Sequence, residues 1–261
     1  MLNTGRHDHR ADRPATITTA DADVSSWTSG QSLAGTVTQG TLANRPTHSQ
    51  AASVVTFAGS TGTGDTTNGK WFGFPTGAGT LPTRIESGSP LLMVYMLVRF
   101  ALVPTWRTRL FGVGTLNNTF QNERRGYGLD VNSGGQLRFW RADSTAVSAQ
   151  TIPGAITANE PIALALVLND DRTTPGTSDN ITRLFVKTKG TGPYPSLTQA
   201  ATAARAVAGN GSPSAMINRD WYTAAAGGIG NFELFAFAAD YAPPTTDAPI
   251  GDNLDRMLGR V

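Results

Sequence analysis

Short apolar segments separated by turn residues are the dominant pattern along the chain. The longest apolar run spans residues 91–102 and lies between Pro90 and Pro104. A run of this length bounded by prolines predicts a strand that is buried on both faces in the middle of a sheet. Residues 110–113 form the next apolar segment, and we expect them to be its hairpin partner.

The clearest hairpin joins residues 127–131 to residues 136–141 through a turn with the sequence Asn-Ser-Gly-Gly. Asn and Gly readily adopt the positive φ angles that tight hairpin turns require. Further strands are predicted at 53–57, 70–74, 161–168, 181–187 and 230–238.

Two segments favour short helices. Residues 197–208 are rich in alanine and end at Gly209, which is typical of a helix with a glycine C-cap. Residues 247–258 follow a proline pair and form the second candidate.

The N-terminal segment, residues 1–22, has only Leu2 and Ile17 as sizeable apolar side chains. So few apolar groups do not offset the backbone entropy of ordering the segment. We therefore predict an extended arm over residues 1–22 that is dispensable for folding and is ordered by neighbouring subunits. The domain itself is expected to span residues 23–261.

Composition supports an all-β protein. Among 261 residues there are 29 glycines, and only 15% are charged, too few to cover the exposed faces of many helices. The chain has no cysteine, so disulfides and thiolate metal sites are excluded. A net charge of +2 gives no footprint for nucleic acid. The longest apolar run contains Arg99 and is shorter than the ~20 residues that span a bilayer, so no membrane insertion is expected.

The serial order of these segments resembles concanavalin A-like, laminin-G-type jelly-roll domains, of the kind found in bacteriophage structural proteins. The segments that carry the resemblance are 27–30, 39–47, 53–59, 91–114, 127–140, 162–187 and 229–258. The resemblance implies a two-sheet antiparallel β-sandwich, here with an extended N-terminal arm and one or two short helices. It implies fold more strongly than function, because function depends on sites added to a fold.

No catalytic residues are predicted. Glycoside hydrolysis needs two carboxylates at a defined separation, and related glucanases place them in a Glu-x-Asp-x-Glu strand. None of the four glutamates lies in such a pattern; they are Glu86, Glu123, Glu160 and Glu233. His48 is the one histidine outside the predicted arm, and we expect it in a surface turn. We therefore predict a protein that is not an enzyme.

Calcium is the cofactor that the sequence could accommodate, and no other is expected. The resemblance implies it, because related domains bind calcium through oxygen ligands in loops. The candidate ligands share one polar loop and are Asp170, Asp171, Asp179 and Asn180, with Asp130 and Asn132 at a second turn. Asp and Asn are also the usual residues of a solvated loop, so both interpretations stay open.

Tryptophan side chains offer the other candidate site. Trp106 and Trp221 lie in polar, turn-like segments, where an exposed ring could stack on a sugar. Trp71 and Trp140 lie in strand patterns, and we expect them to pack in the core.

Two functions follow from these observations. The first is a bacteriophage virion structural protein, such as a capsid decoration, head-fibre or tail component. Such a protein would form homo-oligomers, bind other virion proteins and be assembled in the host cytoplasm. The alternative is a lectin-like, carbohydrate-binding module that recognises a cell-surface glycan of the host.

Overall fold

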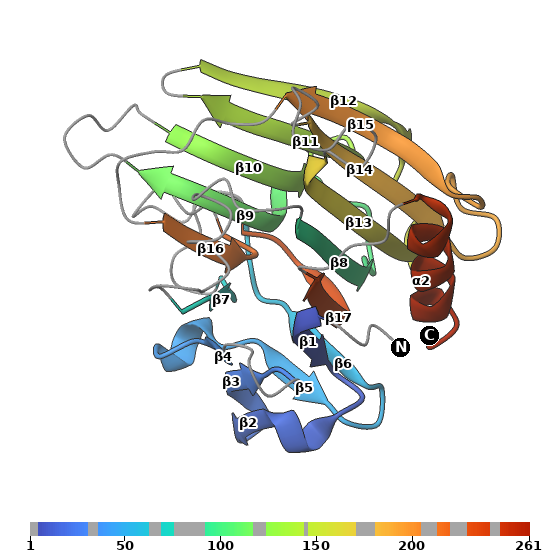
Figure 1. Cartoon of the computed structure of the whole chain (residues 1–261). Helices are drawn as coiled ribbons and strands as arrows, with labels where there is room; N and C mark the ends of the chain where they lie inside the picture. The colour runs from blue at the N-terminus through green and yellow to red at the C-terminus, as the bar shows by residue number, and fades with distance from the viewer. Residues whose placement is uncertain are drawn as a thin grey trace.

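The computed structural model describes residues 5–30, 36–62, 69–75, 92–116, 124–143, 146–170, 181–204, 213–219, 229–240 and 246–261. Antiparallel strands dominate these residues, with two 3-10 turns at Pro14–Thr16 and Leu42–Asn44 and the helix α2, Ala248–Leu258 (Figure 1). The strands are β1 Gly5–Arg10, β2 Ile17–Ala20, β3 Asp23–Thr28, β4 Thr36–Thr38, β5 Thr47–Ser49, β6 Val54–Phe57, β7 Phe72–Gly73, β8 Leu92–Arg99, β9 Thr108–Leu116, β10 Arg124–Val131, β11 Gln136–Asp143, β12 Ala146–Ala155, β13 Pro161–Asp170, β14 Ile181–Thr188, β15 Thr198–Ala204, β16 Pro213–Ile217 and β17 Phe232–Asp240.

The strands form two layers. Sheet 1 has the order β15-β14-β13-β8-β17, and the far edge of β17 pairs with β6 along its first half and with β1 along its second half. Sheet 2 has the order β12-β11-β10-β9-β16-β7-β4-β3-β2. The short strand β5 pairs with both β3 and β6 and so joins the two sheets at one corner. The predicted fold class, a two-sheet antiparallel β-sandwich, is confirmed.

The inner core between the sheets combines aliphatic side chains with a group of contacting aromatic rings. Phe57 stacks on Phe232 with ring centroids 4.8 Å apart. Phe237 from sheet 1 meets Phe74 and Phe111 at 5.0 and 5.7 Å. Offset and tilted contacts of this kind are the favoured arrangements of aromatic pairs.

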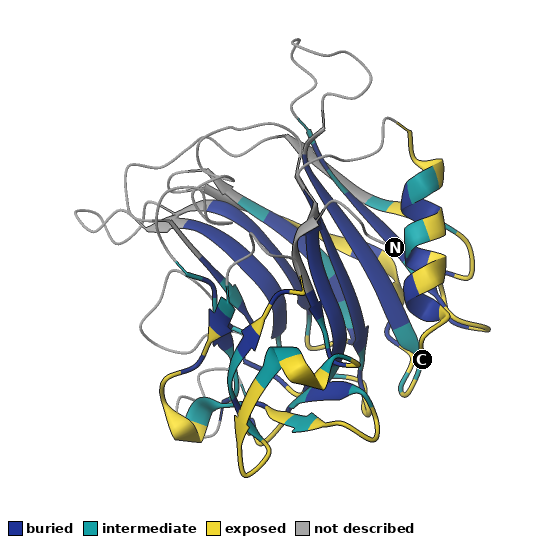
Figure 2. Cartoon of the chain, turned by 60° about the horizontal axis from the view of Figure 1, so that its bottom comes forward, coloured by how far each residue is buried: buried dark blue, intermediate teal, exposed yellow. Residues whose placement is uncertain are grey.

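A second apolar cluster lies on the outer face of sheet 1, beneath α2. The buried side of this helix includes Ile250, Leu254 and Met257, while its outward side is exposed (Figure 2). It packs on β13 and β14, and the cluster beneath it continues through alternate residues of β8 that point away from the inner core. Strand β8 lies between β17 and β13 and is buried on both faces, as the apolar run predicted. Helix α2 confirms the prediction for residues 247–258.

The N-terminal segment is not an extended arm. Strand β1 lies beside β17 and pairs with it (Figure 1). The pairing places His9 in the inner core, where its ring lies 5.6 Å from that of Trp27. Ala11 is also fully buried, and its N–H donates to the carbonyl of Phe235. The prediction counted only large apolar side chains. The segment is instead held by strand pairing and by a buried imidazole, which the apolar count left out.

Two further predictions are wrong. The segment 197–208 contains strand β15 rather than a helix, because pairing with β14 satisfies backbone groups that a helix would satisfy internally. Residues 110–113 belong to β9, which pairs with β10 and β16 in sheet 2 and not with β8. The connection after β8 therefore crosses from one sheet to the other.

Candidate ligand-binding cleft

The connection between β8 and β9 carries two exposed apolar side chains. Leu102 is 79% exposed and Val103 is 42% exposed. Val103 rests on the β10–β11 turn, since a Cβ added to Gly135 would collide with its Cγ1. Gly135 also has a φ of +72°, a conformation that favours glycine. Another residue at position 135 would therefore disturb the turn that supports Val103.

Trp106 ends the same connection and is fixed by its indole nitrogen. Nε1 donates a hydrogen bond to the carbonyl of Ile229 at 3.2 Å. The same carbonyl accepts from the hydroxyl of Ser60 at 3.3 Å. The ring is half-buried and keeps part of its surface open to solvent. A ring held in this way needs little further ordering when it binds a ligand.

A polar row crosses three strands of sheet 1, and two of its residues, Thr56 and Glu233, also line the cleft. Glu233 on β17 lies directly opposite Thr56 on β6 and directly opposite Arg99 on β8. Arg99 Nε donates to Glu233 Oε2 at 2.6 Å. The Arg99 guanidinium also lies 5.2 Å from the centroid of the Phe235 ring. The row therefore marks where the apolar cluster under α2 gives way to polar surface.

Side-chain hydrogen bonds hold the segment that leads into β17. Asn231 accepts from the N–H of Ser60 and donates to its carbonyl, both at 3.0 Å. The buried Asn218 donates to the carbonyls of Lys70 and Gly230 and accepts from the N–H of Gly230. These bonds tie together residues far apart in the sequence and make the floor of the site rigid.

Together these parts enclose an open cleft of about 250 Å³. Its lining residues are Thr56, Phe57, Ala58, Ala101, Leu102, Val103, Pro104, Thr105, Trp106, Thr108, Asn231, Phe232 and Glu233. Most of the lining residues are apolar, and hydroxyl, amide and carboxylate groups lie among them. A cleft of this composition suits a ligand that has one apolar face and one hydrogen-bonding edge.

The predicted tryptophan sites have different outcomes. Trp106 lines the cleft, whereas Trp221 lies outside the described residues. Trp140 is buried beneath the guanidinium of Arg109 at 4.3 Å. Trp71 is half-buried and packs against a different arginine at 4.4 Å. The buried ring of Trp140 agrees with the expected packing, whereas Trp71 does not lie in the core as expected.

The calcium prediction falls mostly outside the described part of the chain. Asp170 is the last residue of β13, and Asp171, Asp179 and Asn180 lie beyond the described residues. No cluster of three or more acidic or histidine side chains that could hold a metal occurs in the ranges that the structure does describe. Calcium binding by that loop stays a prediction.

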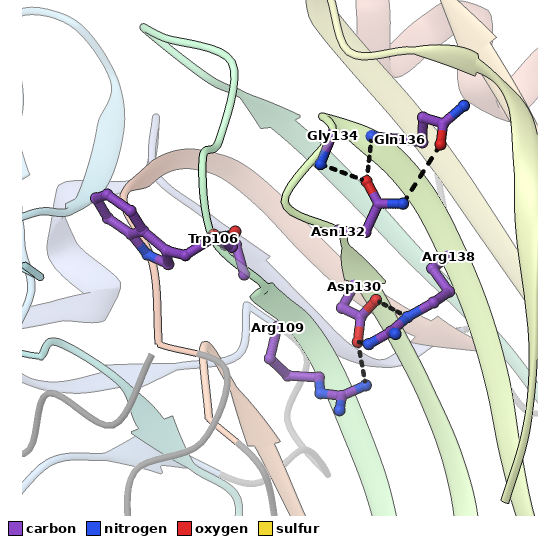
Figure 3. Close-up of polar contacts among 8 residues, drawn as sticks. Trp106, Arg109, Asp130, Asn132, Gly134, Gln136 and Arg138 are labelled. Atoms are coloured by element: carbon purple, nitrogen blue, oxygen red, sulfur yellow. Dashed lines mark hydrogen bonds and ion pairs between the residues drawn. The ribbon is translucent and has the colours of Figure 1, made fainter. Parts of the chain in front are cut away.

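The second turn considered for calcium is occupied by structural contacts. Asp130 is fully buried; it accepts from Arg138 at 2.7 and 2.8 Å and lies 3.2 Å from Arg109 (Figure 3). The Asn132 side chain accepts from the N–H groups of Gly134 and Gln136 and so closes its own turn (Figure 3). The side-chain oxygens of both residues already make contacts that stabilise the hairpin.

The carboxylates of the described residues do not form a catalytic pair at the cleft. Glu233 is the only carboxylate among the lining residues, and its partner is Arg99. Glu160 lies elsewhere and accepts from the hydroxyl of Thr191 at 3.0 Å. Sequence reasoning treated Glu233 as an ordinary strand residue and did not anticipate Leu102 or Val103. Two apolar residues directly before Pro104 were the only signal for an exposed apolar loop.

Comparison with known proteins adds little. No family model and no curated protein matches the chain. Among solved structures, the Ruminococcus gnavus IT-sialidase CBM40 has a TM-score of 0.46 at 11% identity, over 72% of this chain and 92% of that chain. The NanB sialidase of Streptococcus pneumoniae, in complex with 2-[(3-chlorobenzyl)ammonio]ethanesulfonate, has a TM-score of 0.43 at 10% identity, over 62% of this chain and 23% of that chain. A SAP-like pentraxin from Limulus polyphemus has a TM-score of 0.37 at 15% identity, over 59% and 66%. Similarities of this size carry no argument about the ligand of this chain.

No helix in the described residues has the length and apolar character to cross a membrane.

Proposed function

We propose that the protein is a carbohydrate-binding module that holds a saccharide in the cleft between the β8–β9 connection and the row Thr56–Glu233–Arg99. One observation carries the proposal: a fixed, half-buried Trp106 and two exposed aliphatic side chains line the same open cleft as the polar side chains of Thr56 and Glu233.

The chemistry of a pyranose ring matches this arrangement. Its axial C–H groups form an apolar face that packs on aromatic and aliphatic side chains, here Trp106, Leu102 and Val103. Its hydroxyls both donate and accept hydrogen bonds. The Thr56 hydroxyl and Glu233 Oε1 have no hydrogen-bond partner among the described residues and are available to them.

The position of the site also supports a binding role. The polar row lies on paired strands, and the connection that faces it is supported at Gly135 and at Ile229. Binding groups on rigid elements lose little entropy when a ligand binds. The prediction that the protein is not an enzyme is kept, since the cleft supplies one carboxylate that is already paired.

A matched pair of leucine substitutions tests the proposal on a glycan array. Leu102 and Leu42 are both exposed, at 79% and 58%, but only Leu102 lines the cleft. Leu102→Ala is expected to weaken binding about tenfold, the effect of losing part of an apolar contact. Leu42→Ala is expected to bind like the unmodified protein. Equal binding by all three proteins, or no glycan bound by any, would reject the cleft as a saccharide site.

The virion structural role predicted from the sequence is the second candidate. The observation that favours it is the exposure of Leu102 and Val103, because exposed aliphatic groups also serve protein–protein contacts. Mass measurements in solution distinguish the two. A defined oligomer that Leu102→Ala dissociates, without any glycan binding, would favour assembly. The virion location and the other virion proteins as partners belong to this second candidate.

A further inference from the structure

The charge of the cleft indicates which class of saccharide it accepts. Among the described residues that line it, Glu233 is the only charged one. The side chains of Glu233 and Arg99 are 23% and 33% exposed, so the carboxylate is partly open to a ligand. A ligand inside the cleft therefore meets a negative group and no positive one among the described lining residues.

The positive partner of that carboxylate is held in place. Arg99 donates to Glu233 Oε2 at 2.6 Å and stacks over the ring of Phe235. Both residues of the pair sit on central strands in direct cross-strand register, so neither backbone can withdraw. Arg99 does not line the cleft, so a ligand carboxylate held there would lie beside the like charge of Glu233, which is unfavourable.

A neutral saccharide does not meet this obstacle. Its hydroxyls donate to Glu233 Oε1 and to the Thr56 hydroxyl, and hydrogen bonds to a charged acceptor are stronger than neutral ones. We propose that the cleft selects neutral over acidic saccharides, and that Glu233 sets this selectivity through its negative charge at the cleft. This inference rests on the proposed function.

Paired probes test the selectivity. Each neutral oligosaccharide that binds on the array is compared with its derivative in which one primary alcohol is oxidised to a carboxylate. The protein is expected to bind the neutral member of the pair about five- to tenfold more tightly, as one like-charge contact at a partly exposed site implies. Stronger binding of the oxidised member would overturn the inference while leaving the saccharide site intact.

The substitution Glu233→Gln tests the inference through an expected gain in binding of the oxidised probe. It keeps the side-chain volume, removes the negative charge and leaves the Arg99 guanidinium open to an anion. The preference is expected to vanish or reverse through tighter binding of the oxidised probe. Glu160→Gln is the matched control, since Glu160 is half-buried and does not line the cleft. An unchanged preference in Glu233→Gln would show that another group sets the selectivity.

A measurement on the unmodified protein keeps the inference testable if Glu233→Gln does not fold. Repulsion between partly exposed charges is screened by salt. Raising the salt concentration should therefore bring the affinities of the two probes together by strengthening the oxidised one. A preference that is insensitive to salt would contradict the role of charge. Binding of neither probe would reject the proposed function itself.

Discussion

The two apolar layers on either side of sheet 1 differ in what covers them. The inner core is covered by a second sheet and contains contacting aromatic rings, including those of Phe237, Phe74 and Phe111. The outer cluster is closed by one helix and consists mainly of aliphatic side chains packed around Tyr95 and Phe185. Strand β17 contributes to both layers because its side chains alternate between the two faces, and a bulge at Phe235 places both Phe235 and Ala236 in the outer cluster.

The comparison explains the unbroken apolar runs of β8 and β17. A strand that faces one core alternates apolar and polar residues, whereas a strand between two apolar layers does not. Where the outer cluster ends, the alternation returns: Arg99 and Glu233 face outward while Phe100 and Phe232 face the inner core. The cleft begins at this transition.

The largest expected effect is in the inner core. Phe237 is fully buried and contacts the rings of His9, Phe74 and Phe111. Phe237→Ala should lower the free energy of unfolding by about 3–5 kcal/mol, the cost of removing a ring from a packed core. Equilibrium denaturation measures this loss. A change below about 1 kcal/mol would place Phe237 outside the cooperative core.

A smaller effect is expected in the outer layer. Phe235 is 8% exposed, and one side of its ring meets Arg99 rather than another apolar group. Phe235→Ala should cost about 2 kcal/mol, because the cavity opens toward the surface and can relax. The same denaturation experiment gives the ratio of the two losses. Equal losses would show that the helix closes its layer as firmly as the second sheet closes the inner core.

Much of the fold can be predicted from local sequence patterns, and the predictions that were wrong have physical causes. The runs that became β8, β13 and β17, and the turn at 132–135, carry their signal in adjacent residues. Strand β15 was mistaken for a helix, since alanine and threonine suit either structure and the open edge of β14 decides between them. The pairing of β1 with β17 joins the two ends of the chain and has no local signature.

The cleft was predictable only in part. The polar setting of Trp106 indicated an accessible ring, and this was enough to propose a sugar platform. The opposing row was not predictable, because Thr56, Arg99 and Glu233 are distant in sequence and meet through strand register. Sequence alone does not specify register between strands so far apart.

The most direct test of the saccharide site is to follow the indole N–H signals of the five tryptophans by NMR during titration with a neutral oligosaccharide. Trp106→Phe assigns the signal that matters. The Trp106 signal is expected to shift as the cleft fills, because its ring forms part of the binding wall. The signals of the buried Trp27 and Trp140 should stay in place. Saturable binding that leaves the Trp106 signal unmoved would contradict the assignment of the cleft as the saccharide site.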